Sequence, residues 1–252
     1  MIIASWNINS VRARLEILQS WLQSVQPDVL LLQELKCQDE QFPLLEIQNL
    51  GYQAIISGQK AYNGVAILSK HPIVELSRSL IPDDPQARFL AAEIQGVHMV
   101  TIYAPNGNPL GTEKFPYKLS WLAALEEYAK MALRKATPFF IAGDYNIIPT
   151  PLDVYNPKAF LGDALFQPES IDKYRRLVNL GLYDAYRALY PNEQAYTFWD
   201  YQAGCWPNNQ GLRIDHFLLN AEAMDRLQRC WIDREPRALE KASDHTPILI
   251  EL

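Results

Sequence analysis

The chain has 252 residues, of which 48% are hydrophobic and 21% charged, a composition that predicts a globular protein with one large core or two small ones. It contains no run of about 18 apolar residues, so the sequence predicts no transmembrane helix. The formal net charge of −6 argues mildly against a nucleic-acid partner. Because the carboxylates of a metal site add negative charge that a bound divalent cation offsets, local basic residues matter more than the total.

The remaining global features point to one compact intracellular domain. Cys37, Cys205 and Cys230 show neither CxxC spacing nor the pattern of a disulfide framework. The N-terminus enters strand-like sequence without the pattern of a signal peptide, so we expect a cytoplasmic protein. No linker or low-complexity segment interrupts the chain, and residues 1–252 are predicted to form a single domain.

The predicted elements mix strands and helices. Apolar runs predict strands at 2–8 and 28–33, and helical spacing predicts a helix over 11–25, with Ser10 as its N-cap and Pro27 beyond its end. Further strands are predicted at 64–69, 73–80, 88–95, 97–104, 138–143, 213–220 and 246–251. Helices are predicted at 113–134 and 170–189, the second with a break near Gly181. Strands 2–8 and 138–143 each end in polar residues and are each followed by helical sequence and a strand that carries a carboxylate. This internal similarity favours two halves, each a sheet with helices, that face each other.

Polar residues stand at the ends of several of these apolar runs. They are Asn7, Glu34, Asp144 and Asn146, Asp215, and Asp244 with His245. A polar group at the end of a buried strand costs desolvation energy unless another group pairs with it. Several such residues across the chain therefore indicate strand ends that converge on one cation and one anion, as in a metal-dependent hydrolase.

The individual residue types fit that chemistry. Glu34 is a natural ligand for a hard cation such as Mg²⁺, although an isolated glutamate at a strand end is more often exposed. Asp144 could position or deprotonate a water and Asn146 could donate to a phosphate oxygen, because the i, i+2 spacing places both on one face of an extended segment. The alternative for this segment is an ordinary turn.

An Asp–His pair is the next candidate. A carboxylate such as Asp215 on one imidazole nitrogen of His245 would orient the ring and favour its protonated form, which stabilises charge on a phosphate. Tyr103 lies at the end of the strand at 97–104 and Asn106 just beyond it, and both could contact phosphate, although Tyr103 could equally be an aromatic residue at the edge of the core. The other three histidines are interpreted as structural.

Aromatic residues gather at Tyr196, Phe198, Trp199, Tyr201 and Trp206, where they could stack on a base, enclose a sugar or belong to the core. Other chemistries lack their motifs. The sequence has no Walker loop, GxSxG elbow, HExxH motif or GxGxxG in the right context, and nothing marks a base partner for a nucleophilic cysteine.

Six ordered segments resemble those of exonuclease III-type AP endonucleases in the endonuclease/exonuclease/phosphatase superfamily. They are Trp6-Asn7-Ile8-Asn9, Gln33-Glu34-Leu35-Lys36, Tyr103-Ala104-Pro105-Asn106, Gly143-Asp144-Tyr145-Asn146, Gly211-Leu212-Arg213-Ile214-Asp215 and Ser243-Asp244-His245. The resemblance covers essentially the whole chain and implies a four-layer αββα sandwich with two central mixed β-sheets, which is a DNase I-like α/β fold.

The resemblance also implies an activity. We expect a Mg²⁺-dependent phosphodiesterase, with Mn²⁺ as the alternative metal, that cleaves duplex DNA 5′ to abasic sites and leaves a 3′-hydroxyl. It implies 3′–5′ exonuclease or 3′-phosphodiesterase activity as well. The expected partner is duplex DNA with an abasic site or a 3′ end, and no membrane partner is expected. The expected state is a cytoplasmic monomer that associates with the nucleoid through its DNA substrate.

Roles follow from the resemblance residue by residue. Glu34 would hold the metal, helped by Asn7 and by Asp215 or Asp244. Asp144 would align or activate the attacking water, and Asn146 would bind the water or the phosphate. His245, oriented by Asp215, would contact the scissile phosphate, while Tyr103 would contact the phosphate or assist the leaving group. The number of metals and the identity of the general base stay open.

The resemblance further implies residues that contact DNA. Candidates for the backbone are Arg88, Lys36, Asn106, Lys114 and Lys118, which would position the duplex without reading its sequence. Phe198, Leu212 and Ile214 would wall the abasic pocket, and Trp206 would be a wedge in the groove. Two rival functions are a superfamily phosphodiesterase acting on lipid headgroups, inositol phosphates or DNA non-specifically, and a catalytically silent DNA-binding homologue.

Overall fold

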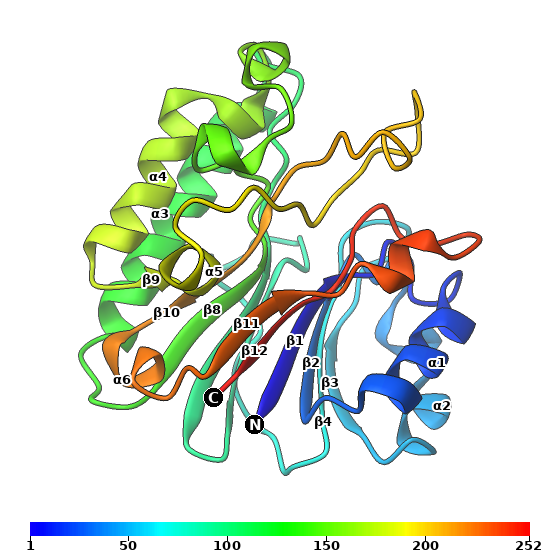
Figure 1. Cartoon of the computed structure of the whole chain (residues 1–252). Helices are drawn as coiled ribbons and strands as arrows, with labels where there is room; N and C mark the ends of the chain where they lie inside the picture. Colours follow the sequence, from blue (N-terminus) through cyan, green and yellow to red (C-terminus); the bar gives the residue numbers. More distant parts are fainter.

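Two six-stranded mixed sheets face each other between layers of helices, as the edge-on view in Figure 1 shows. The computed structural model describes residues 1–252. The first sheet has the order β11 (Arg229–Ile232), β12 (Ile248–Glu251), β1 (Ile2–Asn7), β2 (Val29–Gln33), β4 (Val65–Ser69), β3 (Gln53–Ser57). The second has the order β5 (Val74–Ser77), β6 (Phe89–Ile94), β7 (Val97–Tyr103), β8 (Phe139–Asp144), β10 (Asp215–Leu219), β9 (Tyr183–Asp184). The expected four-layer sandwich is confirmed.

The helices cover the outer faces of the sheets. Helices α1 (Leu15–Val25) and α2 (Leu44–Gln48) pack on the first sheet, and α3 (Lys114–Ala132) and α4 (Pro168–Asn179) pack on the second. The short helices α5 (Ala185–Leu189) and α6 (Ala221–Met224) flank β10. None of the helices combines the length and apolar content needed to cross a bilayer.

The continuous apolar runs form central strands because both faces of each sheet are buried. In β2, Val29 and Leu31 point into the core between the sheets, while Leu30 and Leu32 point to the layer of α1 and α2. Strand β1, which pairs in parallel with β2, and strand β8, which pairs in parallel with β7, are likewise buried along almost their whole length. Such runs fix the position of each strand, so the polar residue at its end is placed with them.

The start of the first helix differs from the prediction. Helix α1 begins at Leu15, and Ser10 is not its N-cap. Asn9 and Ser10 have positive φ angles of 46° and 85°, because the backbone here turns across the end of β2, where the N–H of Ser10 donates to the carbonyl of Glu34 (2.7 Å). The residues before α1 therefore hydrogen-bond to the segment that follows β2 and do not cap the helix.

Several short elements were not predicted, and others are shorter than expected. Strands β3 and β11 and helices α2 and α6 are four or five residues long, too short for a clear periodic pattern. The helix expected at 170–189 is interrupted near Gly181, as predicted, by β9 between α4 and α5. Strand β5 is confined to Val74–Ser77, where an irregularity interrupts its pairing with β6.

The strand register brings the polar ends to one edge of the sandwich. Strands β1 and β2 run parallel, with Asn7 opposite Gln33, so Asn7 and Glu34 lie at the same end. In the second sheet, Asp144 of β8 lies between Tyr103 of the parallel β7 and Asp215 of the antiparallel β10. The chain termini lie at the other end, where the amino group of Met1 donates to the carbonyl of Leu252 (2.6 Å).

Candidate active site

Asn7 joins the two sheets at the centre of the site. Its Nδ2 donates to Glu34 Oε1 in the first sheet's layer and to Asp144 Oδ2 at the end of β8, each at 2.9 Å. Asn7 is fully buried, and its own carbonyl accepts a hydrogen bond from Ser243 Oγ (2.7 Å). One amide thus fixes two carboxylates from opposite halves of the molecule.

His245 lies between two aspartates. Its Nδ1 is 2.8 Å from Asp215 Oδ2, and its Nε2 is 3.7 Å from Asp144 Oδ2. Burial alone would lower the pKa of His245, but the charges of Asp215 and Asp144 outweigh it and raise that pKa well above the usual value. The predicted Asp215–His245 pair is present, with the imidazole held in its cationic form.

Asp144 is almost fully buried, and burial raises the pKa of its carboxyl. The cation at His245 opposes that rise, while the charges of Asp215 and Glu34 add to it. The backbone N–H of Asn146 donates to Asp144 Oδ1 (2.8 Å) and fixes the orientation of the carboxyl group. A carboxyl with a raised pKa beside a cationic imidazole is a suitable proton acceptor for a water at this position.

Gly143 allows β8 to approach β7 this closely. Its φ angle is +138°, and a Cβ at this position would lie 2.1 Å from the carbonyl oxygen of Ile102. Any side chain would push the two strands apart just before Asp144. Gly143 is therefore required for the close approach of β8 to β7, and not for a turn.

Glu34 leaves β2 in the left-handed conformation, with a φ angle of 53°, which is uncommon for a residue other than glycine or asparagine. Burial opposes ionisation of its carboxyl, but the Asn7 amide and the Lys36 ammonium outweigh burial and lower its pKa. Lys36 Nζ is 2.9 Å from Glu34 Oε2. A cation thus already pairs with the carboxylate expected to bind metal.

The donor set fits a hard cation. Ligand atoms of Glu34, Asp144 and His245 lie within 4.8 Å of one another, and Asp215 Oδ1 is buried without a hydrogen-bond partner. Three carboxylates therefore face one imidazolium and the half-buried Lys36 ammonium, leaving excess negative charge among largely buried side chains. Oxygen-rich sites of this kind suit Mg²⁺ or Mn²⁺.

Asp244 and Asn9 lie beside this cluster rather than within it. Asn9 Nδ2 donates to Asp244 Oδ1 (2.9 Å), and Asn9 Oδ1 accepts from Lys36 Nζ. Sequence reasoning gave no role to Asn9, Ser243 or Thr197, although Asn9 follows Asn7 at the same i, i+2 spacing that marked Asp144 and Asn146. Thr197 Oγ1 accepts hydrogen bonds from the backbone N–H groups of Ile214 and Asp215. No sequence motif predicted this role of Thr197.

Asn146, Asn106 and Tyr103 extend the site from the second sheet. Asn146 Nδ2 donates to the carbonyl of Ala104 (2.9 Å), and Asn106 Nδ2 donates to Asn146 Oδ1 (3.1 Å). Burial and the nearby Glu34 and Asp144 carboxylates raise the pKa of the Tyr103 hydroxyl well above its usual value, so this hydroxyl stays protonated and is available as a donor. The three residues lie together, as the sequence predicted.

Lys118 does not contact the surface, and the prediction that it binds the DNA backbone is wrong for this position. Its side chain is fully buried, and Nζ donates to the backbone carbonyls of Asn106, Asn146 and Ala164 at 3.0, 2.5 and 3.3 Å. Burial lowers the pKa of Lys118 to about 7. Lys118 therefore ties together the loops that carry Asn106 and Asn146.

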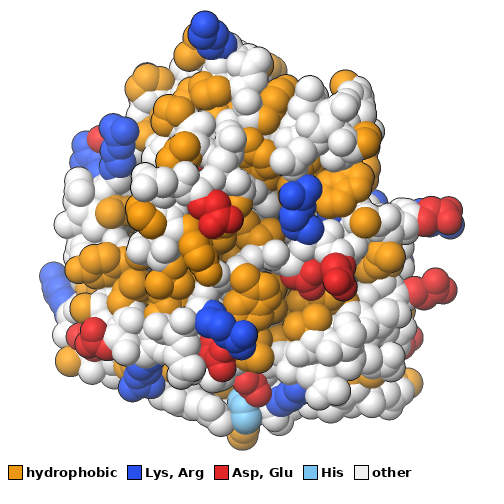
Figure 2. Space-filling model, in the orientation of Figure 1, with side chains coloured by type: hydrophobic (Ala, Val, Ile, Leu, Met, Phe, Trp, Pro, Cys, Tyr) orange, Lys and Arg blue, Asp and Glu red, His pale blue; other side chains and the backbone are white.

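The other candidates for DNA contact differ in exposure. Arg88 is half-buried over the ring of Tyr103 (4.7 Å to the centroid) and donates to its carbonyl, whereas Asn106 and Lys114 are exposed. On the face shown in Figure 2, Lys and Arg side chains are separated from one another and interspersed with Asp and Glu. That face presents no continuous basic surface.

Of the residues expected at the abasic pocket, Phe198 lies beside His245 and Leu212 pairs with Phe198. The Phe198 ring packs edge-on against the imidazole at 5.0 Å, while Leu212 and Ile214 are buried below the surface. Trp206 is held in a separate cluster, against Trp199 at 4.8 Å and under the guanidinium groups of Arg234 and Arg237.

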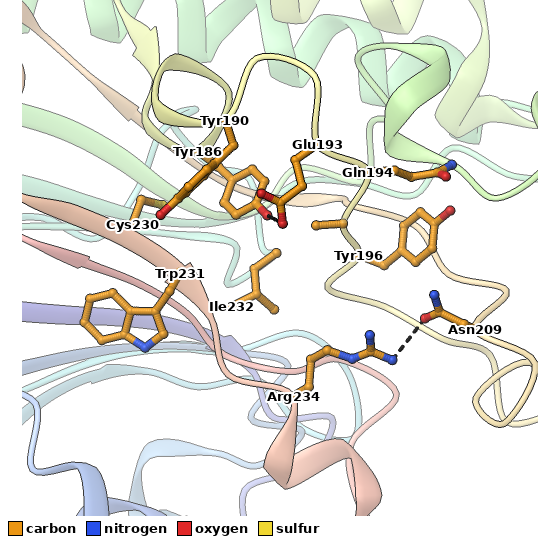
Figure 3. A pocket seen from close by; sticks show the side chains of 11 residues that line it. Tyr186, Tyr190, Glu193, Gln194, Tyr196, Asn209, Cys230, Trp231, Ile232 and Arg234 are labelled. Atoms are coloured by element: carbon orange, nitrogen blue, oxygen red, sulfur yellow. Dashed lines mark hydrogen bonds between the residues drawn. The ribbon is translucent and has the colours of Figure 1, made fainter.

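A separate cavity of about 320 Å³ lies between α5, the segment 193–196 and β11 (Figure 3). Four of its polar side chains pair with one another, because Tyr186 donates to Glu193 (3.0 Å) and Arg234 donates to Asn209 (3.0 Å). It contains none of the carboxylates around Asn7, so the chemistry is not located there.

Comparisons with known proteins agree with this geometry. The model of the Endonuclease/Exonuclease/phosphatase family matches residues 4–245. The chain is 37% identical to exodeoxyribonuclease III of Haemophilus influenzae, with 98% of each chain covered. It superposes with a TM-score of 0.96 on a 3′ phosphatase from Neisseria bound to a product DNA hairpin, at 36% identity over 100% of this chain and 99% of that one.

An AP endonuclease from Archaeoglobus fulgidus is similar to the same degree. The TM-score is 0.96 at 34% identity, and the match covers 99% of this chain and 98% of the other. The family model and these full-length relatives include every strand that carries a residue of the site. The chain therefore belongs to the Endonuclease/Exonuclease/phosphatase family.

Proposed function

We propose that this protein is a DNA-repair nuclease that cleaves duplex DNA on the 5′ side of abasic sites, leaves a 3′-hydroxyl, and also acts at DNA 3′ ends. The observation that carries the proposal is the buried arrangement of Asn7, Asp144, Asp215 and His245 at the meeting of the two sheets. Relatives that match the full chain are an exodeoxyribonuclease, a 3′ phosphatase and an AP endonuclease, which supports DNA as the substrate.

Glu34 would hold a divalent metal together with Asn7, and Asp215 is a further ligand candidate because its Oδ1 has no partner. Asp244 is a candidate at the edge of the cluster. We propose Mg²⁺, with Mn²⁺ as the alternative, because all these side chains offer oxygen donors. When bound, such a metal polarises the phosphate and stabilises charge on the departing oxygen.

The chain's own groups supply the rest of the chemistry. Asp144 would accept a proton from water as the water oxygen bonds to phosphorus and the P–O3′ bond breaks; the 3′-oxygen then takes a proton to become a hydroxyl. Asp215 keeps His245 cationic, so the imidazolium can stabilise the negative oxygens of the phosphate. Asn146, held by Asn106 and Ala104, would bind the phosphate or the water, and the protonated Tyr103 would donate toward the phosphate or the leaving group.

The test is the substitution Asp144→Asn, which keeps the shape and removes the proton acceptor. We expect cleavage of a duplex with one abasic site to fall by about 10²–10⁴-fold, while the affinity for the same duplex, measured in EDTA, stays close to that of the wild type. Near wild-type cleavage by Asp144→Asn would show that another group accepts the proton. A matched loss of binding would show that Asp144 supports the fold.

A further inference from the structure

Two chain segments project beyond the site end of the sandwich, opposite the chain termini (Figure 1). One is the loop 199–210, which leads to β10 of the second sheet. The other is the segment 233–243, which joins β11 to β12 of the first sheet. The reaction proposed above gives no role to the contacts between these two projections.

Trp206 contacts the other projection through two cations. The Cζ atoms of Arg234 and Arg237 lie 5.1 and 5.3 Å from the centroid of its indole ring. The indole also packs edge-on against Trp199, with 4.8 Å between ring centroids and an angle of 88°. Because tryptophan is the aromatic side chain that attracts cations most strongly, these contacts hold the loop against the segment 233–243.

Arg237 is a buried cation without a carboxylate partner. It is only 7% exposed, its Nε is buried without a hydrogen-bond partner, and it forms no ion pair. Its Nη2 donates to the carbonyl of Trp199 (3.0 Å), and its guanidinium lies over the rings of Tyr201 and Trp206. A buried charge is unfavourable unless other groups compensate it, and here one carbonyl and two rings of the opposite projection do so. Arg237 therefore joins the two projections.

The base of the loop is bonded to the segment that carries the catalytic imidazole. The N–H of Trp199 donates to the carbonyl of Asp244 (2.8 Å), and the hydroxyl of Tyr201 donates to the carbonyl of Ala242 (2.8 Å). Beyond this base, residues 202–204 are exposed. A duplex that brings a phosphate to the catalytic cluster reaches the molecule at this same end, so the loop lies beside its path.

We propose that Arg237 and Trp206 are positioning residues for DNA binding, which clip the two projections together and hold loop 199–210 in place before the DNA arrives. The proposal rests on the nuclease function proposed above. A loop that is ordered in the free protein loses less conformational entropy when DNA binds. The clip therefore raises the affinity for the duplex and leaves bond breaking unchanged. Trp206 acts from within the protein and is not a wedge between base pairs.

The experiment measures single-turnover incision of a duplex with one internal tetrahydrofuran over a range of enzyme concentrations, which gives the maximal rate and the half-saturating concentration. The variants are Arg237→Met, Trp206→Ala, their combination, and Trp206→Phe, which restores an aromatic ring. Arg229→Met is the matched control, because it removes an exposed guanidinium 5.1 Å from the centroid of the Trp231 ring, at the end of β11 near the chain termini. Amide hydrogen exchange of loop 199–210 is measured without DNA.

We expect the half-saturating concentration to rise about 5- to 100-fold in Arg237→Met and Trp206→Ala, the range for ordering two or three side chains. The double variant should bind no more weakly than the weaker single variant, because both residues act through one contact. Trp206→Phe should recover most of the affinity, and loop exchange should be faster in Arg237→Met than in the wild type. Maximal rates, and both values of the control, should stay within about twofold of wild type.

A loss of affinity in Trp206→Ala with Arg237→Met close to wild type would identify a wedge and overturn the clip. A lower maximal rate at unchanged half-saturation, or unchanged loop exchange, would overturn it as well. Failure of the wild type to incise the tetrahydrofuran duplex would instead overturn the proposed function, while DNA affinity in EDTA and loop exchange would still test the clip. If thermal unfolding shows that Arg237→Met is misfolded, Arg237→Lys takes its place, since it keeps the charge and loses the planar guanidinium.

Discussion

The buried charge cluster behind the site carries a quantitative prediction. Asp153 is fully buried and accepts hydrogen bonds from Arg213 Nε (2.7 Å), Arg187 Nη2 (2.6 Å) and the backbone and hydroxyl of Thr150. Arg213 is also fully buried and pairs with Asp184 at 2.8 Å. Burial alone would raise the pKa of Asp153, but Arg213 outweighs it and holds that pKa low.

Asp153→Asn keeps the shape but removes one of the two negative charges around Arg213. Removing one partner of a buried ion pair costs about 3–5 kcal/mol, because the remaining charge is left without compensation. At about 2–4 °C per kcal/mol for a chain of this size, the melting temperature should fall by roughly 6–20 °C. The loss would also loosen the segment before Asp215, since the N–H of Arg213 donates to the carbonyl of Asp153 (2.8 Å).

Thermal unfolding followed by circular dichroism measures this effect. The matched control is Asp172→Asn, which breaks an ion pair of the same 2.7 Å length with Arg176 on the exposed face of α4. The control should change stability by no more than about 0.5 kcal/mol. A loss below about 1 kcal/mol for Asp153→Asn would refute the reasoning, since it would show that Asp184 alone compensates the buried guanidinium.

Three further predictions concern the site and the core. Lys118→Met should lower turnover at least about tenfold but leave the salt dependence of DNA binding unchanged, whereas loss of a phosphate contact would reduce the salt slope by about 1. Asp215→Asn should lower the pKa of His245 and therefore move the alkaline limb of the pH–rate profile to lower pH. An unchanged profile would show that Asp215 does not control the protonation of His245 during the reaction. Burial lowers the pKa of His98 and of His216 to about 4, so unfolded chains bind more protons below pH 6.5. Stability measured by urea titration should therefore fall between about pH 6.5 and pH 4, by at most about 1.4 kcal/mol per pH unit for each histidine, and His98→Gln should reduce that slope.

The strands that carry the site could be predicted because their sequence signal is strong. The runs before Asn7, Glu34 and Asp144 are apolar except for Ser5 and Gln33, a pattern typical of strands buried on both faces. A polar residue directly after such a run then lies at a sheet edge. Strands β3 and β11 escaped prediction because they are short edge strands, partly exposed and without clear alternation.

The contacts that cross the chain could not be predicted from local pattern. Nothing near Lys118 in the sequence shows that three carbonyls from separate loops surround its ammonium, and lysine is usually exposed. The bridge from Asn7 to both Glu34 and Asp144 depends on how the two sheets face each other. The pairing of Arg213 with Asp153 and with Asp184 likewise joins residues 60 and 29 positions apart, respectively.

The most direct test of the proposed nuclease is cleavage of an end-labelled duplex that carries one internal tetrahydrofuran. The reaction is run with Mg²⁺, with EDTA, and on an undamaged duplex of the same sequence. We expect metal-dependent incision 5′ to the lesion, a product that a polymerase extends from its 3′-hydroxyl, and little internal cutting of the undamaged duplex. A folded protein that hydrolyses a simple phosphodiester but leaves the tetrahydrofuran duplex intact would contradict the account and favour a different phosphodiester substrate.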